Sequence, residues 1–212
     1  MRHLFEKYET IIFDCDGVLL DSNNLKIEAM EKSLIDCSVD KHSTEKCIEY
    51  FKYNFGKSRY HHVNHFMNSF INSDDDELSN RILNKYSELC KILYLSSKVI
   101  PGILDFLGKS NQEMYVASGS DQDELREIFR VIGLSQYFNG IYGSPKSKTD
   151  NVRYILSNNQ GKAALVGDAI SDYEAAKNNN IDFIGFVGYS NVKKELLDLS
   201  IENEFPVFDS WI

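Results

Sequence analysis

Three carboxylates stand close together in the stretch TIIFDCDGVLLDS, which covers residues 10–22. Asp14 and Asp16 lie two residues apart directly after an apolar run, and Asp21 follows five residues later. Carboxylates set close together repel one another and resist burial, so such a loop usually binds a cation, holds a proton or attacks an electrophile. Gly17 allows the chain to turn sharply after the first two acids, because glycine tolerates backbone angles that other residues avoid.

Other short apolar runs also end in a polar residue. Ser118 follows MYVA, Asp168 follows AALVG, and IDFIGF is a further run of this kind. Such runs are typical of buried parallel strands, and helical patterns alternate with them from about residue 99 onward. The alternation predicts an α/β fold with a doubly wound, Rossmann-like parallel sheet. Ligands bind outside the carboxyl ends of the strands in such a sheet, so Asp14, Ser118 and Asp168 are expected to meet there.

A stretch of about 70 residues after the first strand is different, because it contains helical patterns and no convincing strand. The four patterns are NNLKIEAMEKSLIDC, STEKCIEYFKYNF, KSRYHHVNHFMNSFI and DDELSNRILNKYSELCKILYL. Pro101 and Gly102 then end the last helix before the core resumes. We predict an α/β core formed by residues 1–20 and 98–212, with an inserted all-helical cap formed by residues 21–97.

Composition narrows the class of partner. The 212-residue chain has a formal net charge of −9, which argues against broad contact with nucleic acid or an anionic membrane. No window approaches the roughly 18 apolar residues of a membrane span. Four cysteines without CxxC spacing fit reduced thiols in a cytoplasm. We therefore expect a cytoplasmic protein whose partner is a small molecule, and the sequence leaves its oligomeric state open.

Four segments together resemble the motifs of the haloacid dehalogenase superfamily, and they occur in the same order. They are DCDGVLLDS, the serine of VASGS, a lysine in SPKSK, and GDAISD. The helical insert after the first motif resembles the mobile cap of the family's phosphatase and phosphomutase branch. The resemblance implies that the backbone carbonyl of Asp16 ligates a metal, and we place Gly119, beside the motif serine, at the substrate.

The chemistry that these residues favour is phosphoryl transfer to a carboxylate. A phosphate monoester is a dianion, so its attack by a carboxylate needs surrounding positive charge and a positioned nucleophile. We expect Asp14 to attack phosphorus and form an aspartyl phosphate. Asp16 would protonate the departing alcohol and then activate the hydrolytic water. Ser118 and Lys148 would contact the phosphoryl group, and Lys146 is the alternative to Lys148.

Hard oxygen ligands predict a Mg²⁺ cofactor. Asp14 and Asp168 supply two carboxylates without any soft ligand, and Asp16 adds its carbonyl. Asp172 completes the predicted metal site by steadying the waters of the ion. Asp21 is expected to be structural, because an aspartate after a strand is often a turn former or a helix cap.

The segment FGKSRYHH in the insert brings cations and imidazoles together. Lys57 and Arg59 are candidates to bind the non-reacting part of an anionic substrate, although a solvated helix face explains the same pattern. His61 and His65 have i, i+4 spacing, but no nearby cysteine or paired acid completes a tetrahedral metal site.

The leading interpretation is a Mg²⁺-dependent phosphatase that hydrolyses a small phosphorylated metabolite. A sugar phosphomutase of the β-phosphoglucomutase type uses the same loop and stays open as an alternative. A receiver-like phospho-acceptor module is the non-enzymatic alternative, but the helical insert and the DxD spacing argue against it. Dehalogenation is disfavoured, since it needs neither a metal nor an acid and would leave Asp16 and Asp168 unexplained.

Overall fold

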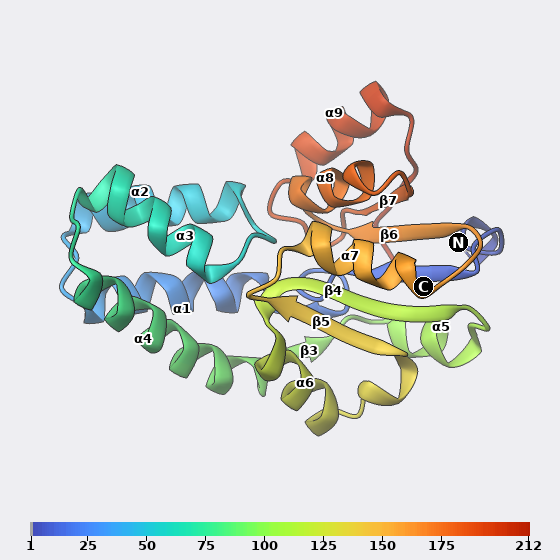
Figure 1. Ribbon diagram of the computed structural model, residues 1–212, viewed down its shortest axis with the longest axis horizontal. Coiled ribbons are helices and arrows are strands. Elements are labelled where there is room, and N and C mark those ends of the chain that lie inside the picture. The colour runs from blue at the N-terminus through green and yellow to red at the C-terminus, as the bar shows by residue number, and fades with distance from the viewer. Residues whose placement is uncertain (1) are drawn as a thin grey trace.

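The computed structural model describes residues 2–212, which form an α/β unit and a helical unit side by side (Figure 1). Six strands make one parallel sheet in the order β5-β4-β1-β6-β7-β8. The strands are β1 (Thr10–Phe13), β4 (Glu113–Asp121), β5 (Gly140–Ser144), β6 (Ala163–Gly167), β7 (Asp182–Phe186) and β8 (Val207–Phe208). Parallel strands of this kind are buried on both faces, which explains their continuous apolar runs.

Strand β1 lies between β4 and β6, and its register fixes where the polar residues emerge. Phe13 is the partner of Val116 in β4 and of Val166 in β6. The residues just beyond these partners therefore reach the same edge of the sheet. This edge is the carboxyl end of all three strands, where ligands bind in open α/β sheets.

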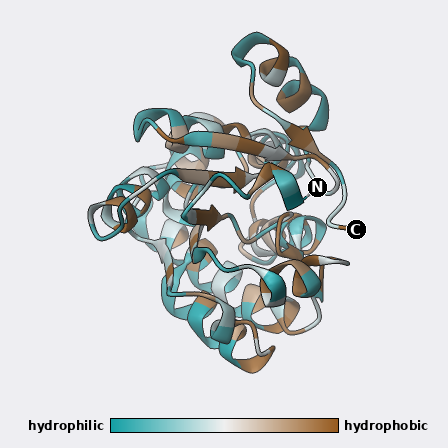
Figure 2. Ribbon diagram, turned by 90° about the vertical axis from the view of Figure 1, so that its right-hand side faces the viewer, coloured by the Kyte–Doolittle hydropathy of each residue, from teal (hydrophilic) through white to brown (hydrophobic). Residues whose placement is uncertain are grey.

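Alternate residues of the strands pack against helices on opposite faces of the sheet. On one face, Ile11 and Phe13 join the core with α5 (Ile103–Lys109) and α6 (Gln122–Val131). On the other face, Ile12 packs with the remaining helices of this unit. These helices are α7 (Lys148–Ser157), α8 (Ile170–Asn178) and α9 (Lys193–Asn203). Figure 2 shows the result as apolar strands between helices of mixed hydropathy.

The helical unit, called the cap below, contains four α-helices (Figure 1). They are α1 (Asn23–Asp36), α2 (Lys41–Tyr53), α3 (Arg59–Phe66) and α4 (Asp76–Tyr94), with a π-helical segment η2 (Met67–Ile71) after α3. The side chains of Asp40, Ser58 and Asp75 cap α2, α3 and α4 by accepting hydrogen bonds from backbone N–H groups of the first turn. The helix starts are therefore encoded locally.

The chain enters and leaves the cap through two short strands that pair with each other. They are β2 (Leu20–Asp21) and β3 (Lys98–Val99), which run antiparallel with Asp21 opposite Lys98. The predicted domain boundaries fall at these two residues, and the division into domains stays a prediction. Two 3₁₀ turns complete the elements, η1 (Arg2–Leu4) and η3 (Ser135–Tyr137).

The predicted fold class is confirmed, with differences in the strands. Strand β4 continues through Ser118 to Asp121, whereas the sequence predicted an end before Ser118. Strands β2, β3, β5 and β8 were not predicted, because GIYGS contains two glycines and the other three strands have only two residues each. Among residues 2–212, no helix is both long enough and apolar enough to cross a membrane.

An aromatic cluster fixes the end of the chain under the loop that follows β1. The Trp211 ring lies 4.9 Å from the Phe106 ring and 5.6 Å from the Phe186 ring, measured between centroids. Its indole N–H donates a hydrogen bond of 3.2 Å to the carbonyl of Val18. Val18 lies between the acids of the first motif, so this contact supports the loop that carries them.

We expect Trp211→Ala to lower the free energy of unfolding by about 3–5 kcal/mol, because it opens a cavity in this cluster. Trp211→Phe should cost less, since it keeps an aromatic ring and loses mainly the hydrogen bond to Val18. Urea unfolding followed by circular dichroism measures both effects. Ile212→Ala is the control, because this neighbour is 90% exposed, and an equal loss in the control would contradict the assignment.

Candidate active site

Asp14 lies at the carboxyl end of β1 and is 2% exposed. The ammonium of Lys148, the first residue of α7, lies 3.0 Å from Asp14 Oδ1 and also donates to Asp172 Oδ1. Lys146, the alternative motif lysine, is exposed and lies over the ring of Tyr154. The structure therefore brings Lys148, and not Lys146, to the nucleophile candidate.

The oxygen atoms of Asp14, Asp168 and Asp172 form a compact acidic cluster. One carboxylate oxygen from each lies within 4.8 Å of the others, and all three side chains are buried. Within residues 2–212, Asp14 Oδ1 and Asp168 Oδ1 are buried oxygens that accept no hydrogen bond of good geometry. Asp14 Oδ1 does form an ion pair with the ammonium of Lys148. Oxygens left open in this way fit a hard cation such as Mg²⁺.

Gly17 keeps space open next to this cluster. Its φ is +75°, and a Cβ atom at this position would lie 2.2 Å from Asp168 Oδ2. Any other residue would be strained and would also displace the Asp168 carboxylate. Asn23, the first residue of α1, holds the same oxygen through a hydrogen bond of 2.8 Å from Nδ2.

Asp172 has less freedom to bind an ion directly. Its Oδ2 accepts hydrogen bonds from the backbone N–H groups of Asp168 and Ala169, at 3.1 and 3.0 Å. Its Oδ1 accepts the ammonium of Lys148. These contacts fit a residue that positions the Asp168 loop and Lys148, and the predicted role of Asp172 at the metal site stays a prediction.

Burial dominates the protonation equilibria of the cluster. It raises the pKa of Asp14 to about 7, against the charge of Lys148, and the neighbouring carboxylates Asp172 and Asp16 act in the same direction as burial. Burial and the charges of Asp14 and Asp172 raise the pKa of Asp168 well above its ordinary value. A cation would lower both values, because it stabilises the ionised carboxylates.

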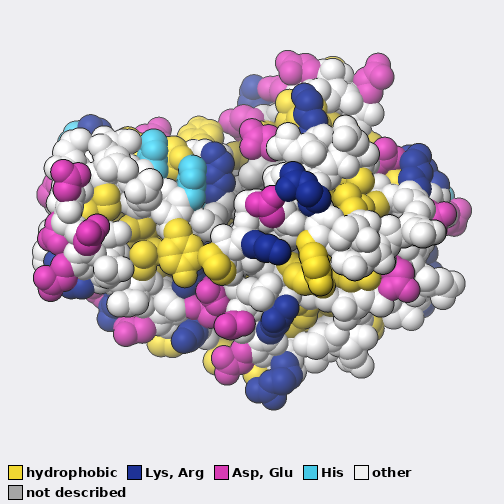
Figure 3. Space-filling view, viewed as in Figure 1, with side chains coloured by type: hydrophobic (Ala, Val, Ile, Leu, Met, Phe, Trp, Pro, Cys, Tyr) yellow, Lys and Arg dark blue, Asp and Glu magenta, His cyan; other side chains and the backbone are white. Residues whose placement is uncertain are grey.

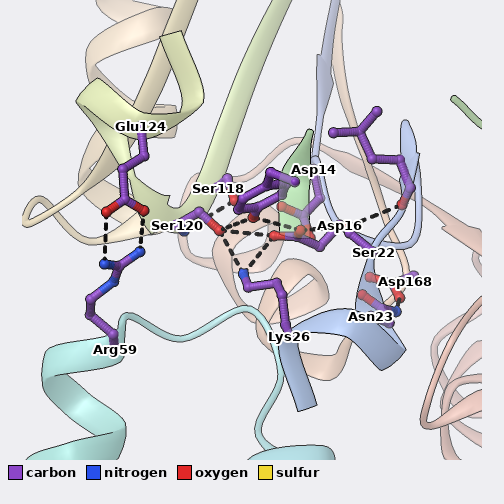
Figure 4. A network of polar contacts seen from close by, with 12 residues as sticks. Asp14, Asp16, Ser22, Asn23, Lys26, Arg59, Ser118, Ser120, Glu124 and Asp168 are labelled. Atoms are coloured by element: carbon purple, nitrogen blue, oxygen red, sulfur yellow. Dashed lines mark hydrogen bonds and ion pairs between the residues drawn. The ribbon is translucent and has the colours of Figure 1, made fainter. Parts of the chain in front are cut away.

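Asp16 stands in a separate hydrogen-bond network, shown in Figure 4. Oδ1 accepts hydrogen bonds from the hydroxyls of Ser22 and Tyr94, at 2.6 and 2.7 Å. Oδ2 accepts from the ammonium of Lys26 at 2.7 Å and from the hydroxyl of Ser120 at 2.9 Å. Burial acts to raise the pKa of Asp16, but Lys26 and these donors outweigh it and hold the pKa below its ordinary value. Asp16 is therefore an ionised carboxylate with every lone pair occupied.

Ser118 and Gly119 lie where β4 departs from regular pairing with β5. The register shifts between Ala117 and Asp121, so the residues between them leave the ladder. Ser118 Oγ accepts the backbone N–H of Ser120 at 3.1 Å, and its own proton has no acceptor in the described part of the chain. That proton is free for a phosphoryl oxygen.

The cap closes on the core at the loop between α2 and α3. A Cβ atom on Gly119 would lie 2.2 Å from the carbonyl oxygen of Gly56. Ser171 at the start of α8 donates a hydrogen bond of 2.9 Å to the carbonyl of Phe55. These contacts bring the cap loop directly against Gly119.

The two cap cations that the sequence selected lie in different surroundings. Arg59 forms two hydrogen bonds with Glu124 of α6, at 3.0 and 2.5 Å, and both side chains are buried. This geometry speaks against the predicted substrate contact of Arg59, because its charge is already neutralised. Lys57 is half-buried, and its Nζ has only one polar partner within residues 2–212, Asn54 Oδ1 at 3.3 Å.

A cleft of about 290 Å³ leads from the surface to Lys148. Lys57 and His61 of the cap and Lys146 of the core are among the residues that line it. In Figure 3, histidine and Lys or Arg side chains lie on the face where the cap meets the α/β unit. The cleft is a positively charged approach to the acidic cluster, which suits an anionic substrate.

Sequence reasoning missed four residues of the site: Asn23, Lys26, Tyr94 and Ser120. Ser22 and Lys26 are four residues apart at the start of α1, so they lie on one helix face and both reach Asp16. This spacing was readable in the sequence once α1 was predicted. Tyr94 and Ser120 carried no comparable local signal.

Comparisons with known proteins agree with this geometry. The family described as "Haloacid dehalogenase-like hydrolase" matches residues 11–186, which is more than half of the chain. A phosphoglycolate phosphatase from Aquifex aeolicus (strain VF5) is 24% identical over 209 residues, which cover 90% of this chain and 91% of that protein.

Solved structures show the same fold. One is described as a predicted phosphatase from Clostridium acetobutylicum; it has a TM-score of 0.74 and 23% identity, and the match covers 94% of this chain and 93% of that one. Another is described as a predicted phosphoglycolate phosphatase from Haemophilus somnus 129pt; it has a TM-score of 0.77 and 14% identity, with 98% and 96% covered. The chain belongs to the haloacid dehalogenase-like hydrolase family.

Proposed function

We propose that the protein is a Mg²⁺-dependent phosphatase that hydrolyses a small phosphorylated metabolite through an aspartyl phosphate on Asp14. The observation that carries this proposal is the pairing of Asp14 with Lys148 at 3.0 Å beside the open oxygen of Asp168. A carboxylate that must attack a dianion needs a cation at this distance, and a structural role would not require a second open carboxylate there.

In the first half of the reaction, an oxygen of Asp14 forms a bond to phosphorus while the bond from phosphorus to the leaving oxygen breaks. Lys148 holds Asp14 in place and offsets the charge of the phosphoryl oxygens. The free proton of Ser118 supports one of these oxygens. A bound Mg²⁺, held by Asp14 and Asp168, would supply further positive charge to the same oxygens.

Asp16 transfers protons in both halves of the reaction. The leaving oxygen takes a proton from Asp16, and Asp16 then takes a proton from the water that attacks the aspartyl phosphate. The ionised form in this structure is the form needed for the second half. The first half requires a free lone pair to carry the proton, so one of its four donors must move away when substrate binds.

The closed cap suits a small substrate. The cap loop touches Gly119, and the pocket beside Asp16 has a volume of about 10 Å³, which is room for about one water molecule. The relative from Aquifex aeolicus is named for phosphoglycolate, a two-carbon phosphate monoester. We therefore place 2-phosphoglycolate first among the substrates to be tested.

Asp14→Asn should lower kcat by at least about 10³-fold, because an amide keeps the size of the side chain but cannot form the acyl phosphate. Release of inorganic phosphate from p-nitrophenyl phosphate and from 2-phosphoglycolate measures the effect. Asp21→Asn is the matched control, since this acid of the same loop is exposed. Residual activity above a tenth of wild type would remove Asp14 from its role.

The wild type should release one phosphate per ester consumed. Isomerisation of a sugar phosphate without release of phosphate would instead favour the phosphomutase.

Mg²⁺ should raise the melting temperature of the wild type and should do so far less in Asp168→Asn, which loses a charged ligand. Phosphatase activity should fall in parallel and should disappear after exhaustive chelation. Differential scanning calorimetry with and without Mg²⁺ gives a measurement that does not depend on turnover. Full activity in the presence of a chelator would exclude the metal, and Asp21→Asn again serves as the control.

The metal-free protein should lose thermal stability as the pH rises from about 4 to about 7. The pKa of Asp14 is raised to about 7 and that of Asp168 is raised as well, so the folded state binds these protons more tightly than the unfolded state. The stabilisation that these bound protons provide is therefore present at low pH. It is lost as the pH rises through the pKa values of the two groups in the folded state. The pKa of Asp16 is lowered in the folded state, so Asp16 changes the stability only at pH values below this range. Melting temperatures in a chelator should fall less steeply for Asp14→Asn, and an equal fall would refute the assignment.

A further inference from the structure

The carboxylate of Asp168 is held by one residue of the cap. Asn23, the first residue of α1, donates a hydrogen bond from Nδ2 to Asp168 Oδ2 at 2.8 Å, and the two residues are 145 positions apart in the chain (Figure 4). Within residues 2–212, this is the only hydrogen bond that reaches either oxygen of the carboxylate. Asn23 is 4% exposed and Asp168 is 1% exposed, so bulk water does not compete for the contact.

The core fixes the backbone of Asp168 but not its side chain. Asp172 Oδ2 accepts a hydrogen bond from the backbone N–H of Asp168 at 3.1 Å. Ser190, in the loop between β7 and α9, donates its hydroxyl to the backbone carbonyl of Asp168. Neither contact prevents rotation of the Asp168 side chain. The orientation of the carboxylate therefore depends on Asn23.

The amide of Asn23 is itself fixed in one orientation. Nδ2 donates both of its protons, one to Asp168 Oδ2 and one to the backbone carbonyl of Tyr189 at 3.0 Å. A flipped amide would place its oxygen against these two acceptors, and both contacts would be repulsive. The amide is therefore a rigid donor to the carboxylate.

Gly17 leaves the space that this contact needs. A Cβ atom at Gly17 would lie 2.2 Å from Asp168 Oδ2 and 2.4 Å from Asn23 Nδ2. Any larger residue would therefore strike both partners of the hydrogen bond. The loop that carries Asp14 thus also provides the room in which Asn23 reaches Asp168.

Buried oxygens without a hydrogen-bond partner gather around this contact. Five buried side-chain atoms within residues 2–212 lack such a partner, and three of them are Asp14 Oδ1, Asp168 Oδ1 and Asn23 Oδ1. A buried polar atom without a partner is costly, and a bound ion with its waters can remove this cost. Mg²⁺ usually keeps several waters, and a water molecule can donate to an amide oxygen. Asn23 therefore combines two occupied donors with an oxygen that suits a hydrated cation.

We propose that Asn23 is a positioning residue for the cation of the active site. By holding Asp168 Oδ2, it keeps Oδ1 in one orientation for the ion. Hydrogen bonds to a metal ligand commonly raise the affinity of the site, because they fix the ligand before the ion arrives. This inference rests on the proposed Mg²⁺-dependent function. It assigns part of the cation affinity to the cap, although all the predicted ligands belong to the core.

Calorimetric titration with Mg²⁺ alone, at one fixed pH and without substrate, tests the proposal. Asn23→Ala should raise the dissociation constant of Mg²⁺ by about tenfold to a hundredfold, which is the usual loss when a hydrogen bond to a metal ligand is removed. Asn23→Leu should also raise it, because leucine has the same branched shape but donates no hydrogen bond. Asn24→Ala is the matched control, since this asparagine is the next residue of α1 and is exposed, and it should bind Mg²⁺ like the wild type.

The two replacements separate positioning from packing. If Asn23→Leu binds Mg²⁺ like the wild type and Asn23→Ala binds it weakly, Asn23 only fills space and the proposal is wrong. Equal constants in the wild type and both variants also refute it. Differential scanning calorimetry without metal identifies a variant that does not fold, and the other variant then carries the test.

Turnover of p-nitrophenyl phosphate gives a second readout. Asn23→Ala should need about tenfold or more Mg²⁺ to reach half of its maximal rate, and its kcat should recover as Mg²⁺ saturates, because Asn23 acts through Asp168 and not on the substrate. A lower kcat with an unchanged requirement for Mg²⁺ would contradict the proposal. If the wild type itself binds no Mg²⁺ in the titration, the metal of the proposed function is refuted instead.

Discussion

Four buried carboxylates share one edge of the sheet, and their mutual repulsion is the constraint on which the rest of the structure depends. Asp14, Asp16, Asp168 and Asp172 are each at most 3% exposed. Lys148 serves Asp14 and Asp172, and Lys26 serves Asp16. Two ammonium groups do not balance four carboxylates, so the protein holds part of the cluster protonated or takes up a cation. The open oxygens of Asp14 and Asp168 show where that remaining charge imbalance is concentrated. In the proposed function, a bound cation would offset this imbalance.

The cap takes part in this balance of charge, since Lys26 and Asn23 belong to α1. Movement of the cap away from the core would take the ammonium from Asp16 and the amide from Asp168 at the same time. The Arg59–Glu124 pair connects the two units at a second place, and a buried pair of this kind costs much more to break than it contributes when intact. The position of the cap and the state of these buried carboxylates are therefore physically coupled. In the proposed function, the exclusion of water and the assembly of the site would then occur together.

The sequence predicted the parts of the site that local patterns encode. Strand β1 and strand β6 show as apolar runs that end in an aspartate, so their pattern alone places Asp14 and Asp168 at one edge of the sheet. Lys148 could be chosen over Lys146 only because it opens a helical pattern. The contact of Lys26 with Ser120 joins residues 94 positions apart, and that of Arg59 with Glu124 joins residues 65 positions apart. No local periodicity encodes such pairs, so Arg59 appeared to be a free cation. Strand β5 was missed for a different reason, because its two glycines hide its pairing with β4.

The division of labour between the two units explains why the family is recognised more easily than the substrate. For the proposed function, the core must present a nucleophile, a cation site and a proton carrier in one geometry, and this requirement would fix residue types at strand ends. The cap has to complete Asp16 and enclose a leaving group, and several side chains could satisfy Asp16 equally well. Serine, tyrosine and lysine all donate to it here. Of these donors, only the lysine carries a full charge, and that charge is paired with Asp16. The contacts that satisfy Asp16 can therefore vary without a change in the residue types at the strand ends.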